Sequence, residues 1–247
     1  MISIKLFGKT DIKDYTLIEG FPGVGLVGPM AISYIVDKLK MDYIGYVESE
    51  SFPPLVSVHG STPMPPIRIY ASKGSKLVAI FAEFAVTMDL VYPLSDAVYN
   101  FVKGNGLSSI YSIGGMPLPQ QGPGADAPFA IASTPAALKE AKDAGLKPVE
   151  EGVSTGVSAM LLLKSANEKS KDINIMVPVQ QNIIDPSTAV IAIQSLNKLM
   201  KLNIDITELD KEAKMVQAKI KEIISKHRET HEGYKKTVDS TGPSMYA

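Results

Sequence analysis

The chain has 247 residues, of which 45% are hydrophobic and 21% charged, and its 25 basic and 26 acidic residues give a formal net charge of −1. This composition is ordinary for a folded globular protein and excludes wholesale disorder. No stretch is long and apolar enough to predict a membrane span, no signal-peptide pattern opens the chain, and the lack of cysteine excludes disulfides and thiolate chemistry. With only two arginines, Arg68 and Arg228, the chain has no basic stripe typical of a nucleic-acid binder, so we expect a cytoplasmic protein.

Apolar runs alternate with helical patterns along the first 204 residues. In chain order, the patterns predict strands at 2–7 and 15–19, a helix at 29–39, strands at 43–47, 55–59, 67–71 and 77–82, a helix at 90–102, a strand at 109–113, helices at 135–144 and 157–167, a strand at 173–179 and a helix from Asp185-Pro186 to residue 201. The alternation predicts a three-layer α/β sandwich with a mostly parallel mixed sheet, antiparallel in part because residues 55–82 contain no helix. Residues 117–128 have no periodicity and are expected to form a functional or mobile loop.

The last 43 residues differ in composition, since 16 of them are charged. We therefore divide the chain into an α/β domain over 1–204, an amphipathic helix over 205–234 and a flexible docking tail over 235–247. The helix has a plausible N-cap in Asp205 or Thr207. Its apolar residues recur at spacings of three and four, beginning with Ile206, Leu209, Ala213, Val216, Ile220 and Ile223. This narrow stripe must pack, either on its own domain or on a helix of another subunit.

The spacing of Gly23, Gly25 and Gly28 matches a dinucleotide-binding fingerprint between a strand and a helix. Glu48 and Glu50 follow about twenty residues later, where such a site holds its ribose-binding acid. Glycines at these positions let a backbone approach a pyrophosphate, and the helix N-terminus favours an anion.

Two neighbours of the glycines oppose this interpretation. Phe21-Pro22 interrupts the approach from the strand, and Pro29 removes an amide at the start of the helix. We favour the alternative, in which the glycines form a tight turn between strand and helix and hold no cofactor.

Gly152-Val-Ser154-Thr-Gly156 matches the pattern of a hydrolase nucleophile elbow. That motif needs a long buried strand before the serine, but residues 147–151 are short and charged. A triad would also have to take its histidine from the charged C-terminal helix. We favour a glycine-flanked N-cap, by Ser154 or Thr155, for the helix that follows.

Other candidate catalytic side chains are sparse. His59 is the only histidine before the C-terminal helix, and no cluster of residues has metal-ligand spacing. Glu19, Glu83 and Asp89 follow predicted strand ends, where α/β folds often place their sites, and could form a carboxylate pair. The spacing alone does not show such a pair, and the shortage of acid–base groups disfavours an enzyme.

The chain ends with Met245, Tyr246 and Ala247, an apolar residue and a tyrosine followed by a free carboxylate. A tyrosine offers a flat apolar ring with a hydroxyl group, and a terminal carboxylate can pair with a lysine in a receiving pocket. A predicted helix followed by a flexible arm with such an end suggests a docking device.

Several segments together are similar to one family. They are Glu19-Gly-Phe-Pro-Gly-Val-Gly-Leu-Val-Gly28, Pro65-Pro-Ile-Arg-Ile-Tyr70, Ser112-Ile-Gly-Gly115, Thr155-Gly-Val-Ser-Ala-Met-Leu-Leu-Leu163, Asp185-Pro186 and Ile204-Asp-Ile-Thr-Glu-Leu209. They span nearly the whole chain, and the chain resembles the archaeal branch of the proteasome assembly chaperone 2 family.

The resemblance implies a phosphorylase/hydrolase-like α/β fold without established catalytic residues or a cofactor. It makes the loop of Phe21, Pro22, Gly23, Gly25 and Gly28 an element of the fold. It also implies homo-oligomers that bind the α-subunits of the core proteasome through a C-terminal hydrophobic–tyrosine–any motif, here Met245, Tyr246 and Ala247. Some family members resemble assembly factors and others activators of the core particle.

From the residues and the resemblance together we expect an ATP-independent, homo-oligomeric proteasome-binding factor that is not an enzyme. Two alternatives stay open. One is a small-molecule hydrolase or phosphorylase-like enzyme that uses the glycine-rich loop. The other is a structural oligomer whose tail never docks on a proteasome.

Overall fold

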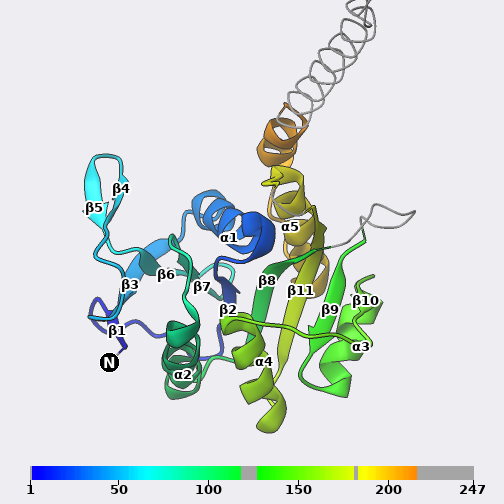
Figure 1. Ribbon diagram of the computed structural model, residues 1–247, viewed down its shortest axis with the longest axis horizontal. Coiled ribbons are helices and arrows are strands. Elements are labelled where there is room, and N and C mark those ends of the chain that lie inside the picture. Colours follow the sequence, from blue (N-terminus) through cyan, green and yellow to red (C-terminus); the bar gives the residue numbers. More distant parts are fainter. Residues whose placement is uncertain (1, 118–126, 181–182, 216–247) are drawn as a thin grey trace, which may run out of the picture.

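The computed structural model describes residues 2–117, 127–180 and 183–215. In this part of the chain a nine-stranded sheet forms the centre, in the order β1-β3-β6-β7-β2-β8-β11-β9-β10 (Figure 1). Its strands are β1 (Ser3–Leu6), β2 (Thr16–Gly20), β3 (Asp42–Glu48), β6 (Ile67–Ser72), β7 (Leu77–Ala82), β8 (Ser109–Pro117), β9 (Phe129–Ala132), β10 (Lys147–Pro148) and β11 (Asp172–Val179).

The sheet has a parallel centre with antiparallel flanks. Strands β7, β2, β8 and β11 run parallel to one another, whereas β6, β3 and β1 on one side and β9 on the other pair antiparallel. A central strand such as β7, with all six residues buried, is apolar throughout because helices cover both of its faces. The predicted mixed sheet is confirmed.

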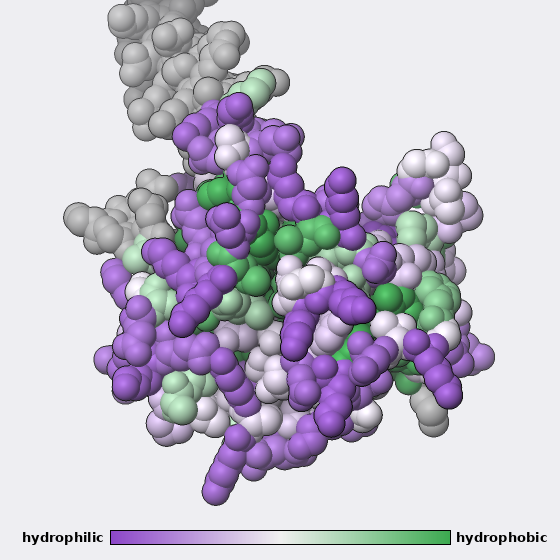
Figure 2. All heavy atoms as spheres, turned by 180° about the vertical axis from the view of Figure 1, so that it is seen from behind, coloured by the Kyte–Doolittle hydropathy of each residue, from purple (hydrophilic) through white to green (hydrophobic). Residues whose placement is uncertain are grey.

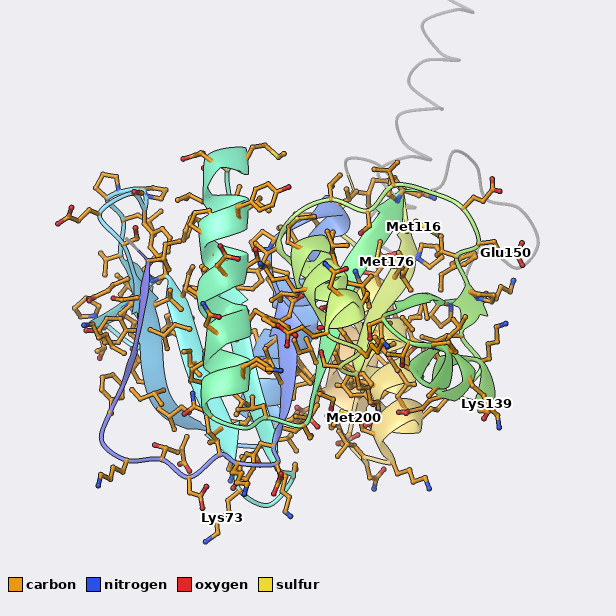
Figure 3. All side chains as sticks on the ribbon, turned by 90° about the horizontal axis from the view of Figure 1, so that it is seen from below. Lys73, Met116, Lys139, Glu150, Met176 and Met200 are labelled. Atoms are coloured by element: carbon orange, nitrogen blue, oxygen red, sulfur yellow. The ribbon has the colours of Figure 1, made fainter. Side chains whose placement is uncertain are left out.

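Helices cover the sheet on two faces, which confirms the three layers. Helices α1 (Val27–Lys38), α3 (Pro135–Asp143) and α5 (Pro186–Met200) share one apolar core with the sheet, and α2 (Met88–Gly104) and α4 (Val157–Asn167) share the other. Figure 3 shows α2 and α4 side by side on the near face. As expected, Asp185 caps α5 and accepts a hydrogen bond from the Ser187 amide at 2.9 Å.

The structure differs from the sequence expectation in its short strands. The strand expected at 55–59 is shorter, β4 (Ser57–His59), and lies outside the main sheet in a hairpin with β5 (Thr62–Met64) that stands away from the body (Figure 1). Strands β5, β9 and β10 were not predicted, because each is brief and lacks a run of β-branched residues. Residues 118–126 of the expected loop lie outside the described residues.

The C-terminal helix begins against its own domain. Residues 207–215 are helical, and Leu209 and Ala213 are buried in the same core as α1 and α5. The Asp205 carboxylate accepts a hydrogen bond from the Thr207 amide at 3.0 Å, and the Lys38 ammonium pairs with Glu208 at 2.5 Å. Figure 2 shows apolar side chains gathered below the base of this helix, within a hydrophilic surround. The later stripe residues, from Val216 on, lie outside the described residues.

Across the described ranges, no helix is both long and apolar enough to cross a bilayer.

Replacing Leu209 with alanine should lower the free energy of unfolding by about 2 kcal/mol, because it removes a buried leucine that joins the helix to the domain. Met215→Ala on the same helix is the matched control, since Met215 is 64% exposed, and should change stability little. Urea unfolding measures both variants. Equal effects would contradict the packing of this helix on its domain.

Candidate functional site

The glycine-rich loop connects β2 to α1 through a short 3-10 turn, Val24–Leu26. Gly25 has a φ of +72°, a left-handed conformation that glycine adopts at little cost. Leu26 follows with a φ of +51° and is the residue from which α1 starts, without a side-chain cap. The loop therefore has a sharply bent backbone that the glycine at position 25 permits.

Two of the fingerprint glycines lie so close to other strands that a side chain would not fit. A Cβ added to Gly28 would lie 2.5 Å from the Ile113 carbonyl oxygen, and one added to Gly25 would lie 2.9 Å from Val179. Around Gly23, by contrast, an added Cβ would meet nothing within 4 Å. The space in front of Gly25 and Gly28 is thus occupied by β8 and β11, and the oxygen that faces Gly28 would repel a phosphate.

The structure does not bring the expected ribose-binding acids to this loop. Glu48 lies at the end of β3, and β6 and β7 separate that strand from β2. The Glu48 carboxylate instead pairs with Lys5 of β1 at 3.4 Å, and Glu50 is exposed in the loop after β3. The dinucleotide alternative fails because the strand after α1 lies at the antiparallel flank, away from β2.

The nucleophile-elbow pattern is also placed differently. The strand before it is the two-residue edge strand β10, so Ser154 does not stand at the end of a buried central strand. Our expectation that Ser154 or Thr155 caps α4 is wrong. Gly156 is the N-cap, with a φ of +88°, and no side chain accepts a hydrogen bond there.

Glu83 belongs to an ion cluster beside the hairpin. Arg68 is 2% exposed, and its guanidinium binds both oxygens of Glu83, at 2.5 and 3.1 Å. It also donates to the Tyr70 hydroxyl at 2.9 Å and lies over the ring of Phe81. His59 Nε2 lies 3.0 Å from the same carboxylate. Although partial burial acts against it, hydrogen bonding led by Arg68 lowers the pKa of Glu83 to about 2.

A polar row crosses the parallel centre of the sheet. Glu19 of β2 lies opposite Ser112 of β8, which lies opposite Asn174 of β11. Asp172 is two residues before Asn174 and so projects from the same face. All four side chains are at most 2% exposed. They face α4, whose Ser165 hydroxyl donates to Asp172 at 3.1 Å.

The two carboxyl groups of this row form the pair that sequence spacing could not show. The Phe21 amide donates to one Glu19 oxygen at 3.1 Å. Burial raises the pKa of Glu19, although the nearby hydroxyl groups of Ser112 and Ser158 act to lower it. Burial also raises the pKa of Asp172, and repulsion from Glu19 raises it further. Neither Glu83 nor Asp89 takes part, since Glu83 binds Arg68 and Asp89 is exposed in the first turn of α2.

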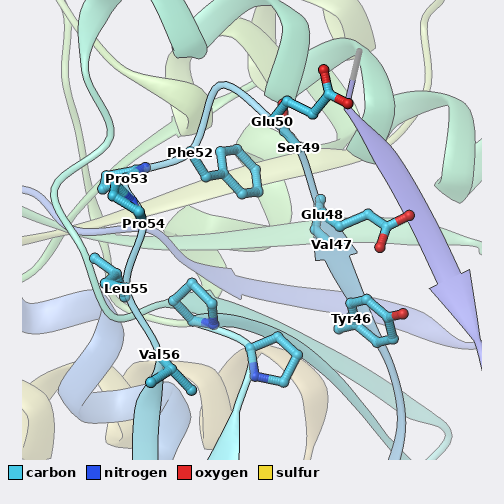
Figure 4. Close-up of a pocket in the computed structure, with 12 residues that line it drawn as sticks. Tyr46, Val47, Glu48, Ser49, Glu50, Phe52, Pro53, Pro54, Leu55 and Val56 are labelled. Atoms are coloured by element: carbon cyan, nitrogen blue, oxygen red, sulfur yellow. The ribbon is translucent and has the colours of Figure 1, made fainter.

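An open groove of about 580 Å³ lies between the end of β3 and the base of the hairpin (Figure 4). Much of its lining is formed by apolar residues: Phe52, Leu55, Val56 and the proline pairs at 53–54 and 65–66. Val56 is 57% exposed. The groove is apolar on the hairpin side, carries Glu48, Ser49 and Glu50 on the other, and is distant in the sheet order from the polar row.

The C-terminal motif of Met245, Tyr246 and Ala247 lies outside the described residues. Its docking role stays a prediction. Sequence reasoning singled out Glu19 and missed its partners Asp172, Ser112 and Asn174. The signal available was a set of polar residues inside otherwise apolar strands, such as Asn174 in Ile173-Asn-Ile-Met-Val177.

Comparison with known proteins gives a consistent result. The model of the PAC2 family matches residues 17–224. An uncharacterized protein of Methanocaldococcus jannaschii is 26% identical over 219 residues, which cover 89% of each chain.

Solved structures are similar over nearly the whole length. Pyrococcus furiosus PbaA, described as an archaeal homolog of proteasome-assembly chaperone, aligns with a TM-score of 0.82 and 25% identity, over 98% of this chain and 100% of that one. PbaB of the same organism, described as an archaeal proteasome activator, aligns with a TM-score of 0.78 and 22% identity, over 90% of this chain and 98% of that one. At 22% identity, the likeness to PbaB concerns the fold alone.

Gly28→Ala should destabilise the protein by about 2 kcal/mol, because the new methyl group would meet the Ile113 carbonyl oxygen and force the backbone apart. Gly23→Ala is the control and should be nearly neutral, since its added Cβ meets nothing and its φ of −147° suits any residue. Thermal and urea unfolding measure the difference. If the two variants behaved alike, the packing role of Gly28 would be refuted.

The Arg68–Glu83 pair predicts a specific loss of stability in acid. The pKa of Glu83 is about 2 in the folded state against 4.5 ordinarily, so its contribution is present above pH 4.5 and is lost as the pH falls toward 2. Glu83→Gln should remove this part of the pH dependence of unfolding, and the exposed Glu150→Gln should keep it. A Glu83→Gln variant with the native pH profile would contradict the assignment.

Proposed function

Because this chain belongs to the PAC2 family, we propose that it is a proteasome-binding factor that works without ATP, as an assembly chaperone or as an activator. The observation that carries the proposal is the likeness to Pyrococcus furiosus PbaA over 98% of this chain and 100% of that one. That protein is described as an archaeal homolog of proteasome-assembly chaperone, which makes the core proteasome the first partner to test.

The C-terminal residues are the proposed docking element. Tyr246 would supply an apolar ring and a hydroxyl group, and Met245 would fill an adjoining pocket. The free carboxylate of Ala247 would pair with a lysine between two α-subunits, a recurring way to capture a chain end. The thirteen residues of the tail reach at most about 45 Å when extended.

The start of the C-terminal helix supports a tail that projects from a fixed point. Leu209 and Ala213 are buried against the domain, and the Tyr34 hydroxyl donates to the Asp205 carbonyl at 3.0 Å. A homo-oligomer would carry several such tails, and their effective concentration would turn weak single contacts into firm binding. The homo-oligomer and its cytoplasmic location remain predictions.

The geometry of the carboxyl pair favours a binding protein over a hydrolase. Glu19 and Asp172 each have a relative exposure of 0%, so a substrate cannot reach them in this conformation. Ser154 precedes a helix without a buried strand behind it. These observations support the non-enzymatic proposal and weigh against the alternative that uses the glycine-rich loop.

Tyr246→Ala should weaken binding to purified core proteasome at least about thirtyfold, because a fully buried aromatic anchor commonly contributes 2 kcal/mol or more. Tyr234→Ala, a second tyrosine of the C-terminal region, is the matched control and should bind as the native chain does. Surface-immobilised proteasome measures the affinities, and thermal unfolding confirms that both variants fold equally well. Unchanged binding by Tyr246→Ala would refute docking through the tail.

A further inference from the structure

The buried row of Glu19, Ser112, Asp172 and Asn174 has no part in the proposed docking. In the described residues, four of its oxygen atoms have no hydrogen-bond partner: Glu19 Oε1, Ser112 Oγ, Asp172 Oδ1 and Asn174 Oδ1. Because these side chains are at most 2% exposed, bulk water cannot satisfy them. Buried polar atoms without partners each cost free energy, so an arrangement with four of them calls for a further group.

The chemistry of the four oxygens indicates what that group must supply. Carboxylate and side-chain amide oxygens only accept, and the Ser112 hydroxyl can donate a single hydrogen. Within the described part of the chain, the groups that act on the pKa of Glu19 are Ser112, Ser158 and the Phe21 amide, and those that act on Asp172 are Glu19 and Ser165. None of them carries a positive charge. Among the groups that act on its carboxyls, the row therefore lacks a counter-charge.

We propose that Glu19, Ser112, Asp172 and Asn174 bind one hard divalent cation, of the class of Ca²⁺ or Mg²⁺, between the sheet and α4. Such cations prefer carboxylate, amide and hydroxyl oxygens, and two carboxylates balance their charge. The row contains neither histidine nor cysteine, the ligands that transition metals favour, and in the described residues no group of three or more His, Asp or Glu side chains is placed to hold a metal.

The other oxygens of the two carboxyl groups are already held in place. The Phe21 amide binds one oxygen of Glu19 at 3.1 Å, and the Ser165 hydroxyl binds one oxygen of Asp172 at 3.1 Å. Hydrogen bonds of this kind orient the carboxylates toward a metal. The cation would join β2, β8 and β11 at the point where the glycine-rich loop begins, and it would enter as the chain folds, since the four side chains of the row are buried.

The test begins with protein refolded from denaturant in a chelator, then refolded with CaCl₂ or MgCl₂ at constant KCl. Mass spectrometry of the dialysed protein should find about one divalent ion per chain. At about a hundredfold excess over the dissociation constant, the unfolding temperature should rise by roughly 5–10 °C. The assignment of a divalent cation would be overturned if KCl or NaCl alone raised the unfolding temperature and the dialysed protein retained no divalent ion.

Glu19→Gln and Asp172→Asn keep the side-chain shapes and remove one charge each. Both should weaken binding of the added ion at least about tenfold, since even loss of an outer partner of a ligand costs that much. Glu50→Gln and Asp89→Asn, at exposed carboxylates, should bind as the native chain does.

If Glu19→Gln or Asp172→Asn fails to fold, Asn174→Asp tests the cation site instead. A third carboxylate in the same place should strengthen binding of Ca²⁺ and enlarge the rise in unfolding temperature. If the native chain binds no divalent ion and Asn174→Asp only destabilises it, the carboxyl groups carry protons instead and the proposal is wrong. Proteasome binding is measured separately, so failure here leaves the docking proposal unaffected.

Discussion

The close crossing of the glycine-rich loop over the sheet is the contact on which the rest of the domain depends. Gly28 lies against the Ile113 carbonyl, and a Cβ on Gly20 would lie 2.4 Å from the Gly28 carbonyl oxygen. Because α1 starts this close to β2 and β8, its apolar face reaches the core that it shares with α5. The base of the C-terminal helix packs on the same core, so one backbone crossing influences where that helix begins.

Local periodicity was sufficient to predict the helices and the longer strands. The helix at 157–167 and the Asp185 cap are as expected, because their patterns are long or chemically specific. Brief strands such as β9 and β10 depend on pairing with distant partners and carry no such pattern. The polar row could not be predicted for the same reason, because only the register of the sheet brings Glu19, Ser112 and Asn174 together. Sequence reasoning found the acid and could not find its neighbours.

Family resemblance and local chemistry contributed different parts of the account. The resemblance indicated the fold and the family, whereas fingerprint matching alone suggested a cofactor site. In the structure, Gly25 and Gly28 of the fingerprint stand where neighbouring strands pack too closely for a side chain. The proposed docking residues lie instead at the other end of the chain, so under this proposal the α/β domain would serve as a support for the tail, in keeping with the rule that one fold serves many functions.

Co-sedimentation with purified core proteasome tests the central claim most directly. The native chain is compared with a chain that ends at Ser244, and peptide hydrolysis is followed in the same samples. The account predicts that the native chain sediments with the core particle and the shortened chain does not, with faster hydrolysis identifying an activator and unchanged hydrolysis an assembly factor. Equal sedimentation of both chains, or none by either at tens of micromolar protein, would contradict it.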